Sequence, residues 1–501
     1  MPTPMPPTAL KPQPSTQSSL QQGHNSLRLP TIVMLVTVAV FAVIGATHLG
    51  GLRWDFDEGV QAMEAYLWIQ GFPLYEEIFS SDMPLFVGSI AGAFSLLEPS
   101  IQTARGITLI YSSIGLLAVG LLTSTLASRW AGPIAVVLLA VAPDYFLFSR
   151  VCIEDLPSFS LAALSILLLI AYYRSKKPLY LPVSGIVFGL ALLLKLVPIV
   201  ITPVPVAVII LSCHKRGLLP RKTLQQLLLF GFTAACPLLL CMVVFDPNRM
   251  LAQVAGYPAQ ATQAYVSTRA KNLVDILRYL ALDNVGMTML GIYAVWAAAK
   301  RRRWPLWPAI AWLILLILAL AIHVPLWPHL LTGLLFPLAM LAGVGLLEVW
   351  RDLRLKQIGR QERRAAWLVV AVLTISLAAG LAEDTTLLTA PTPTATMHAI
   401  SVIETETSPN SMVLTDEPLV PFLARRRVPG QLTDTSFKRI RSGALTAAQI
   451  IQLAEKHPAE AAFLGSDGRF RLLPDLISWI EAHYATEFEY EDGSRLFTDP
   501  L

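Results

Sequence analysis

Charged residues are scarce in this chain. Asp, Glu, Lys and Arg make up 14% of the 501 residues, and hydrophobic residues make up 54%, whereas about a quarter of an ordinary soluble domain is charged. A shortage of charge combined with long apolar runs excludes a typical soluble protein and predicts a polytopic membrane protein.

Cysteines are few, and basic patches of the kind that bind nucleic acids are also lacking. The four cysteines lie in or beside apolar segments without the spacing of metal ligands, so we interpret them as buried, unreactive thiols. The basic clusters all lie between apolar segments, where membrane topology explains them. The composition therefore gives no reason to expect a nucleic-acid partner.

Long apolar segments dominate the rest of the sequence. Residues 1–28 are rich in Pro, Ser and Gln, and we predict a disordered cytoplasmic tail there. Residues 29–384 are predicted to form the transmembrane domain, with about eleven spans. The candidate spans are about 31–50, 104–127, 131–148, 157–173, 179–194, 197–212, 223–245, 276–299, 304–322, 326–349 and 366–382.

The basic residues between the spans predict the orientation. They fall in every second loop, at Arg129, 174–177, 215–222, 300–303 and 351–364, and Lys and Arg are retained on the cytoplasmic side. The opposite loops are acidic, so we predict a cytoplasmic N-terminus and an external C-terminus in the plasma membrane. The apolar segment 84–97 would span only about 21 Å as a helix, too short for a core of about 30 Å. We therefore place it in the external interface.

The first external loop, residues 51–103, concentrates acidic residues. Asp55, Asp57, Glu58 and Asp82 lie there, and acids at a membrane surface are costly unless they bind or catalyse something. A carboxylate here can take a proton from an acceptor hydroxyl. The structural alternative is a capping box in which Asp55 and Glu58 start a helix over about 58–70, and it leaves Asp57 unassigned. Gly71 is a fitting residue to end that helix.

Further polar residues mark the same predicted face. Asp155 is either a helix cap or a second acid beside Asp57. Lys195 is a lone cation at the external end of a span, where it either snorkels or binds a phosphate, and Arg269 could add to such a site. His329 lies with His323 at another external turn; two histidines alone are weak evidence for a metal, and interfacial packing is the alternative.

Residues 385–501 differ in composition from the rest. Pro391 and Pro393 mark a linker, and the residues after it are polar enough for a small external α/β domain. Short buried strands are predicted at 411–415 and 461–464. A capping box at Thr446 and Gln449 predicts one helix, and 474–484 predicts another.

The order of the motifs resembles a known family. A first span is followed by Asp57-Glu58-Gly59, then 71–75 (Gly-Phe-Pro-Leu-Tyr), then 82–86 (Asp-Met-Pro-Leu-Phe), later Asp155-Leu156-Pro157, and finally a Leu-Leu-Lys ending at Lys195. This order resembles the GT-C membrane glycosyltransferases, specifically the family 39 and aminoarabinose-transferase-like group related to protein O-mannosyltransferases. The similarity covers about residues 31–350.

The resemblance implies a mostly α, GT-C type membrane helix bundle with an external active site, a polyprenyl-phosphate sugar donor and inversion at the anomeric carbon. It implies that Asp57 is the catalytic base or positions the acceptor, that Asp155 is the acid of the Asp-x-Pro motif, and that Lys195 contacts the donor phosphate. Glu58, Asp82, Arg269 and His329 complete our predicted substrate-binding set.

One departure from the family pattern affects the donor site. Many relatives have Glu-Lys-Pro-Pro where this chain has Ser81-Asp82-Met83-Pro84, which removes a cation and a metal ligand. We assign no metal ligand and no certain cofactor, and we leave the use of a divalent metal open.

We predict an enzyme, a glycosyltransferase that moves a mannose- or aminoarabinose-like sugar to a glycan, lipid or protein hydroxyl outside the cell. Two alternatives remain. One is a transporter or flippase of a polyprenyl lipid or sugar, and the other is a non-catalytic envelope-assembly protein in the membrane.

Overall fold

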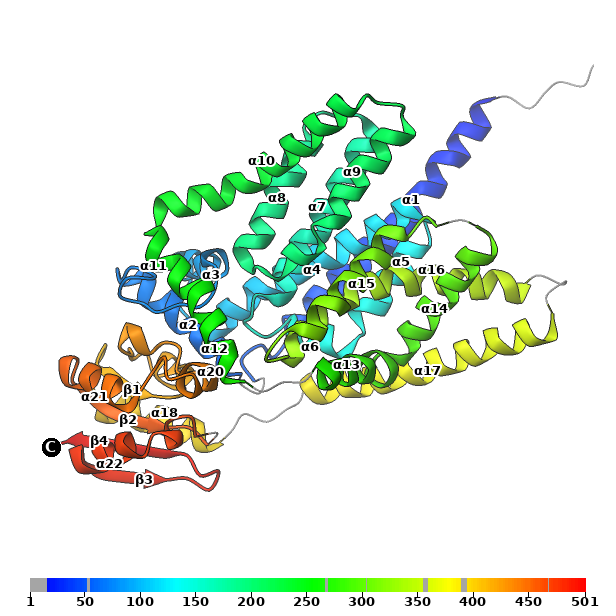
Figure 1. Ribbon diagram of the computed structural model, residues 1–501. Helices are drawn as coiled ribbons and strands as arrows, with labels where there is room; N and C mark the ends of the chain where they lie inside the picture. The colour runs from blue at the N-terminus through cyan, green and yellow to red at the C-terminus, as the bar shows by residue number, and fades with distance from the viewer. Residues whose placement is uncertain are drawn as a thin grey trace, which may run out of the picture.

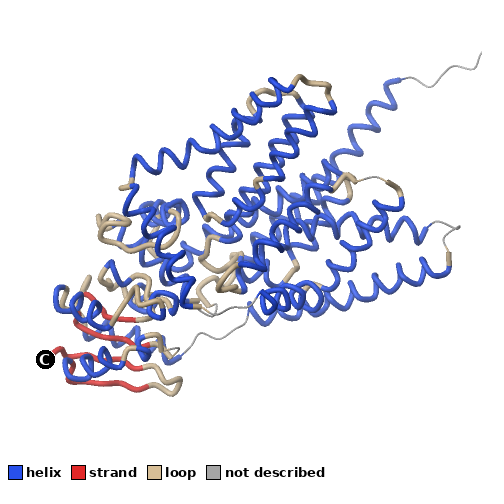
Figure 2. The backbone as a smooth tube through the Cα atoms, viewed as in Figure 1, coloured by secondary structure: helices blue, strands red, loops and turns tan. Residues whose placement is uncertain are grey.

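The computed structural model describes residues 16–51, 55–265, 269–302, 304–354, 359–388, 394–466 and 468–501. A bundle of long helices carries a small domain at one end, and the C-terminus lies in that small domain (Figure 1). All strands that the structure draws belong to this domain (Figure 2). The architecture is mostly α, as predicted, with a small α/β region at the C-terminus.

The bundle is built from apolar helices. In chain order they are α1 (Thr16–Gly45), α4 (Ile101–Leu126), α5 (Ala131–Ala140), α6 (Pro143–Phe148), α7 (Asp155–Ser175), α8 (Tyr180–Leu194), η1 (Val197–Ile201), α9 (Pro203–Lys215), α10 (Pro220–Val244), α13 (Arg269–Arg278), α14 (Val285–Lys300), α15 (Trp307–Ile322), η5 (Pro328–Leu334), α16 (Leu335–Arg354) and α17 (Arg360–Leu388).

Length and hydropathy mark these helices as a multi-pass membrane bundle. Among the described residues, six helices or helix runs are long and apolar enough to cross a membrane. A pair of helices bent by 94°, which ends in α14, is either a broken seventh span or a re-entrant loop. Shorter apolar helices, α8 and α15 among them, accompany them. Each predicted span overlaps one or more helices of the structure, but the number of about eleven spans stays a prediction.

Two predictions in this region differ from the structure. Helix α1 begins at Thr16, inside the segment 1–28 that we expected to be disordered; Ser and Gln do not prevent a helix there. Residues 1–15 of that predicted tail lie outside the described residues. The predicted span 131–148 is divided into α5 and α6, because Pro143 lacks an N–H donor and begins a new helix.

Close helix contacts use small residues. A Cβ built on Gly345 of α16 would lie 2.0 Å from the carbonyl oxygen of Leu290 in α14. Without a side chain at this position the two backbones can touch, which is the usual basis of helix packing in membranes.

The first loop forms two helices, α2 (Phe56–Ile69) and α3 (Pro84–Leu96). The capping box is confirmed: Asp55 caps the helix and Glu58 reaches back to the backbone of Asp55. Gly71 follows with φ of 95°, a conformation that favours glycine. Helix α3 is short, as expected, and lies beside α2 at the end of the bundle near the small domain (Figure 1).

The C-terminal domain has one four-stranded sheet in the order β1-β2-β4-β3. Strands β1 (Met412–Thr415) and β2 (Ala459–Leu464) are parallel, and β4 (Arg495–Pro500) runs antiparallel to both β2 and β3 (Tyr484–Glu489). Its helices are α18 (Thr394–Glu406), α19 (Leu419–Leu423), α20 (Phe437–Arg441), α21 (Ala447–Lys456) and α22 (Pro474–His483). The predicted linker prolines, Pro391 and Pro393, lie outside the described residues.

Candidate active site

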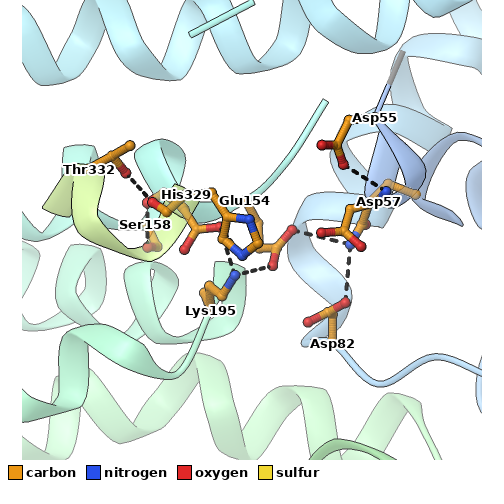
Figure 3. A network of polar contacts seen from close by, with 10 residues as sticks. Asp55, Asp57, Asp82, Glu154, Ser158, Lys195, His329 and Thr332 are labelled. Carbon is orange, nitrogen blue, oxygen red and sulfur yellow. Dashed lines mark hydrogen bonds and ion pairs between the residues drawn. The ribbon is translucent and has the colours of Figure 1, made fainter. Parts of the chain in front are cut away.

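A cavity of about 430 Å³ lies where the first loop, the helix bundle and the C-terminal domain meet. Each of the three regions supplies part of its wall. Its polar and charged lining is Asp55, Asp57, Gln61, Ser81, Asp82, Glu154, Lys195, Tyr257, His323, His329, Asp434, Ser436, Lys438 and Arg469. The carboxylates on the first loop face Lys195 and His329 across this space (Figure 3).

The N-terminus of α2 places Asp57 at the cavity. The Asp57 N–H donates to Oδ1 of the capping residue Asp55 (2.9 Å), so the backbone here is fixed by the start of the helix. Burial, followed by the charges of Asp55 and Glu154, raises the pKa of Asp57 well above its usual range. A carboxylate with a raised pKa is a stronger base than an ordinary aspartate.

Glu58, the next residue, points away from the cavity. Its carboxylate is fully buried against the guanidinium of Arg105, with Arg105 Nε 2.7 Å from Oε1 and Nη2 2.6 Å from Oε2. It also accepts from the N–H of Cys152 at 2.8 Å. Consecutive residues on a helix differ by about 100° in direction, so Glu58 can turn to Arg105 while Asp57 lines the cavity. We therefore replace the predicted substrate-binding role of Glu58 with a structural one.

Lys195 lies between two carboxylates. It ends helix α8, and its Nζ is 2.7 Å from Oε1 of Glu154 and 2.7 Å from Oδ2 of Asp155. His329 Nε2 lies 3.9 Å from the same Asp155 oxygen. The predicted residues Asp155, Lys195 and His329 are thus brought together, with Glu154 as an additional partner.

Gln61 connects this group to the first loop. Its amide nitrogen lies 3.2 Å from Oδ2 of Asp82 and 3.2 Å from Oε2 of Glu154. Burial raises the pKa of Asp82 to about 8, and the charge of Glu154 adds to the shift. Asp82 lines the cavity, and its predicted substrate-binding role stays a prediction. Gln61 was not anticipated because an amide carries no charge signal in a sequence.

The C-terminal domain contributes a wall that the sequence did not predict. Asp434, Ser436, Phe437, Lys438 and Arg469 all line the cavity. The segment 430–438, which contains the first four of these residues, is hydrogen-bonded to the first loop. The N–H of Phe79 donates to the carbonyl oxygen of Gly430 (3.0 Å), and Thr433 Oγ1 donates to the carbonyl oxygen of Phe79 (2.7 Å). No local pattern marks residues from this polar domain as neighbours of Asp57.

Arg269 is not part of this group. It begins helix α13 with an exposed side chain and does not line the cavity. Within the described part of the chain, no group of three or more His, Cys, Asp or Glu side chains is arranged to hold a metal ion.

Comparisons with known proteins agree with this architecture. Residues 82–241 match a family model described as dolichyl-phosphate-mannose-protein mannosyltransferase. A comparison with curated proteins finds no match.

Solved structures show the fold. ArnT from Cupriavidus metallidurans in the apo state is 12% identical with a TM-score of 0.64, and the match covers 94% of this chain and 99% of that one. The same protein bound to undecaprenyl phosphate gives 14% identity, a TM-score of 0.61, and coverage of 93% and 99%. An oligosaccharyltransferase from Archaeoglobus fulgidus is 13% identical with a TM-score of 0.55, and the match covers 93% of this chain and 74% of that one.

The chain is therefore a multi-pass membrane protein with the GT-C fold. The fold that the resemblance implied is confirmed by these structures, and the family model matches inside the region, about residues 31–350, over which the motifs resemble the family.

Proposed function

We propose that this protein is a membrane glycosyltransferase that moves a sugar from a polyprenyl-phosphate carrier to an acceptor hydroxyl. The observation that carries the proposal is the cavity in which Asp57 and Asp82 face the ion-paired Lys195. The fold supports it, because ArnT of the same fold has been solved with undecaprenyl phosphate. The family model that matches residues 82–241 is described as dolichyl-phosphate-mannose-protein mannosyltransferase, a name that includes a lipid-phosphate-linked sugar.

The proposed reaction is a single displacement. The acceptor oxygen attacks the anomeric carbon, the bond from that carbon to the carrier phosphate breaks, and the configuration inverts. The acceptor proton passes to Asp57, and polyprenyl phosphate leaves with the bonding electrons. Phosphate is a good leaving group, so the protein mainly supplies position, a base and stabilisation of charge.

Each neighbour has a part in this scheme. Lys195 faces the phosphate, and Glu154 and Asp155 hold its ammonium in place. Asp82 and Gln61 are positioned to hydrogen-bond hydroxyls of the sugar or the acceptor. His329 adds a nitrogen next to Asp155. We propose a mannose- or aminoarabinose-like sugar, an external active site, a cytoplasmic N-terminus and an external C-terminal domain, consistent with the distribution of basic and acidic loops.

The test is transfer by purified full-length protein in detergent. The protein is supplied with polyprenyl-phosphate-linked mannose or aminoarabinose and a membrane extract as acceptor, without an ion gradient. The Asp57→Asn variant should lose at least about 100-fold in rate while folding normally. Asp475→Asn, an exposed aspartate on α22, is the matched control. Equal rates for wild type and Asp57→Asn would refute the role of Asp57, and activity that needs a gradient would favour a transporter.

A further inference from the structure

The charge of Lys195 in the cavity wall is already neutralised by protein partners. Lys195 contacts two carboxylates, Glu154 and Asp155. Two carboxylates and one ammonium leave this group with one formal negative charge. An incoming phosphate is repelled by such a group unless another cation compensates. The cavity must therefore supply positive charge from elsewhere if it holds a phosphate.

Two other cations line the cavity, and both come from the C-terminal domain. Arg469 forms an ion pair with Glu417, and its guanidinium lies 3.8 Å from the centre of the Phe56 ring. Its charge is thus satisfied within the protein. Lys438, by contrast, has no carboxylate at ion-pair distance among the residues that the structure describes. Its Nζ lies over the Tyr257 ring, 5.6 Å from the ring centre.

The fold holds Lys438 at the cavity through its neighbour. Arg439 Nη1 donates to the carbonyl oxygens of Gln431 (2.6 Å) and Asp434 (2.7 Å), and its guanidinium lies 3.6 Å from the centre of the Phe79 ring. Ser436 caps the same short helix, α20. Arg439 thus anchors the helix to the first loop while Lys438, the preceding residue, lines the cavity.

Burial lowers the pKa of Lys438, while Asp434 and Asp82 act in the opposite direction. A partly desolvated ammonium without an ion-pair partner gains free energy when it contacts an anion. An exposed surface lysine would be hydrated and would gain little from the same contact. This combination of position, burial and lack of a partner distinguishes Lys438 from Lys456, the other lysine of residues 385–501, which is exposed.

We propose that Lys438 binds the phosphate of the lipid-linked donor, so that the C-terminal domain supplies the cation that completes the site. This inference rests on the proposed function and specifies where the phosphate binds. The donor phosphate then lies between Lys195 of the helix bundle and Lys438 of the C-terminal domain. Donor binding requires both regions of the chain.

The test measures the dissociation constant of undecaprenyl phosphate for the full-length protein in detergent. Lys438→Met, which keeps the length of the side chain without its charge, should bind about tenfold more weakly than wild type. Lys438→Arg, which keeps the charge, should recover most of the affinity. Lys456→Met is the matched control, because Lys456 is an exposed lysine on α21 of the same domain.

Undecaprenol, the same lipid without phosphate, separates a phosphate contact from damage to the lipid site. Its affinity should be the same for wild type and Lys438→Met. Equal affinity of these two proteins for undecaprenyl phosphate overturns the assignment of Lys438 and leaves the proposed function intact. A parallel loss for undecaprenol also overturns it, because the contact is then not with phosphate. A wild-type protein that does not bind undecaprenyl phosphate overturns both proposals.

Discussion

Glu58 and Arg105 form a buried two-point ion pair that joins the first loop to the helix bundle. Both side chains have no exposed surface, and the two nitrogen–oxygen distances are 2.7 and 2.6 Å. Glu58 also accepts from the backbone of Cys152, just before Glu154 and Asp155. The pair therefore fixes the position of Asp57 relative to the segment that holds Lys195.

Breaking this pair should destabilise the protein. Glu58→Gln leaves the Arg105 charge buried without a counter-ion, and such changes cost about 3–5 kcal/mol. The apparent midpoint of thermal unfolding in a fixed detergent should fall clearly. The double variant Glu58→Met with Arg105→Met should recover part of the loss, because no lone charge remains. An unchanged midpoint in Glu58→Gln would show that the pair contributes little.

Lys195 and Arg269 should differ in their effect on donor use. Lys195→Met should raise the KM for the lipid-linked donor at least about tenfold, because a charge-assisted contact to phosphate is lost. Arg269→Met should leave the same KM unchanged, since this exposed residue does not line the cavity. Steady-state kinetics at saturating acceptor would measure both. A defect of Lys195→Met in the acceptor KM alone would contradict the phosphate assignment.

Asp82 should make stability depend on pH. Its pKa rises from 3.8 to about 8 on folding, so between these values the unfolded chain has lost a proton that the folded protein keeps. Stability therefore falls as pH rises through this window and levels off above about pH 8. Thermal midpoints from pH 5 to 9 should fall less in Asp82→Asn than in wild type. Asp475→Asn should follow the wild-type curve; identical slopes for all three proteins would exclude Asp82 as the source.

The contact between Gly430 and the first loop should not tolerate a side chain. A Cβ at Gly430 would lie 2.4 Å from the carbonyl oxygen of Glu77, so Gly430→Ala forces the domain and the loop apart at a cost of about 1–3 kcal/mol. Both the thermal midpoint and the transfer rate should fall. Gly92→Ala is the control, because nothing lies within 4 Å of a Cβ there. A Gly430→Ala protein with wild-type stability and rate would show that this contact can relax freely.

Local patterns predicted the local structure well. Apolar runs marked the helices of the bundle, and the capping boxes at Asp55 and Thr446 mark the starts of α2 and α21. The buried strands β1 and β2 were predicted from short apolar runs. Strand β3 was missed because, after the buried Tyr484, it alternates between exposed and half-buried residues and carries little apolar signal. Strand β4 was missed as well, although three of its six residues are buried.

The site was only partly predictable, because side-chain direction and distant contacts are set by tertiary packing. Asp57 and Glu58 are adjacent acids, and nothing in the sequence indicated that one faces the cavity while the other pairs with Arg105. Arg269 was assigned from its charge and its loop. Lys438 was missed because it lies more than 350 residues from Asp82 in the chain, and only the docking of segment 430–439 brings them to the same cavity.

The third wall of the cavity has a consequence for biosynthesis. Residues 434–438 and Arg469 follow every membrane helix of the described chain in the sequence, so a ribosome makes them after the other two walls of the cavity. A nascent or prematurely terminated chain has an open cavity that lacks Lys438. Completion of the polypeptide is thus the event that closes the cavity, and a chain cut before the C-terminal domain has the membrane bundle but only part of the site.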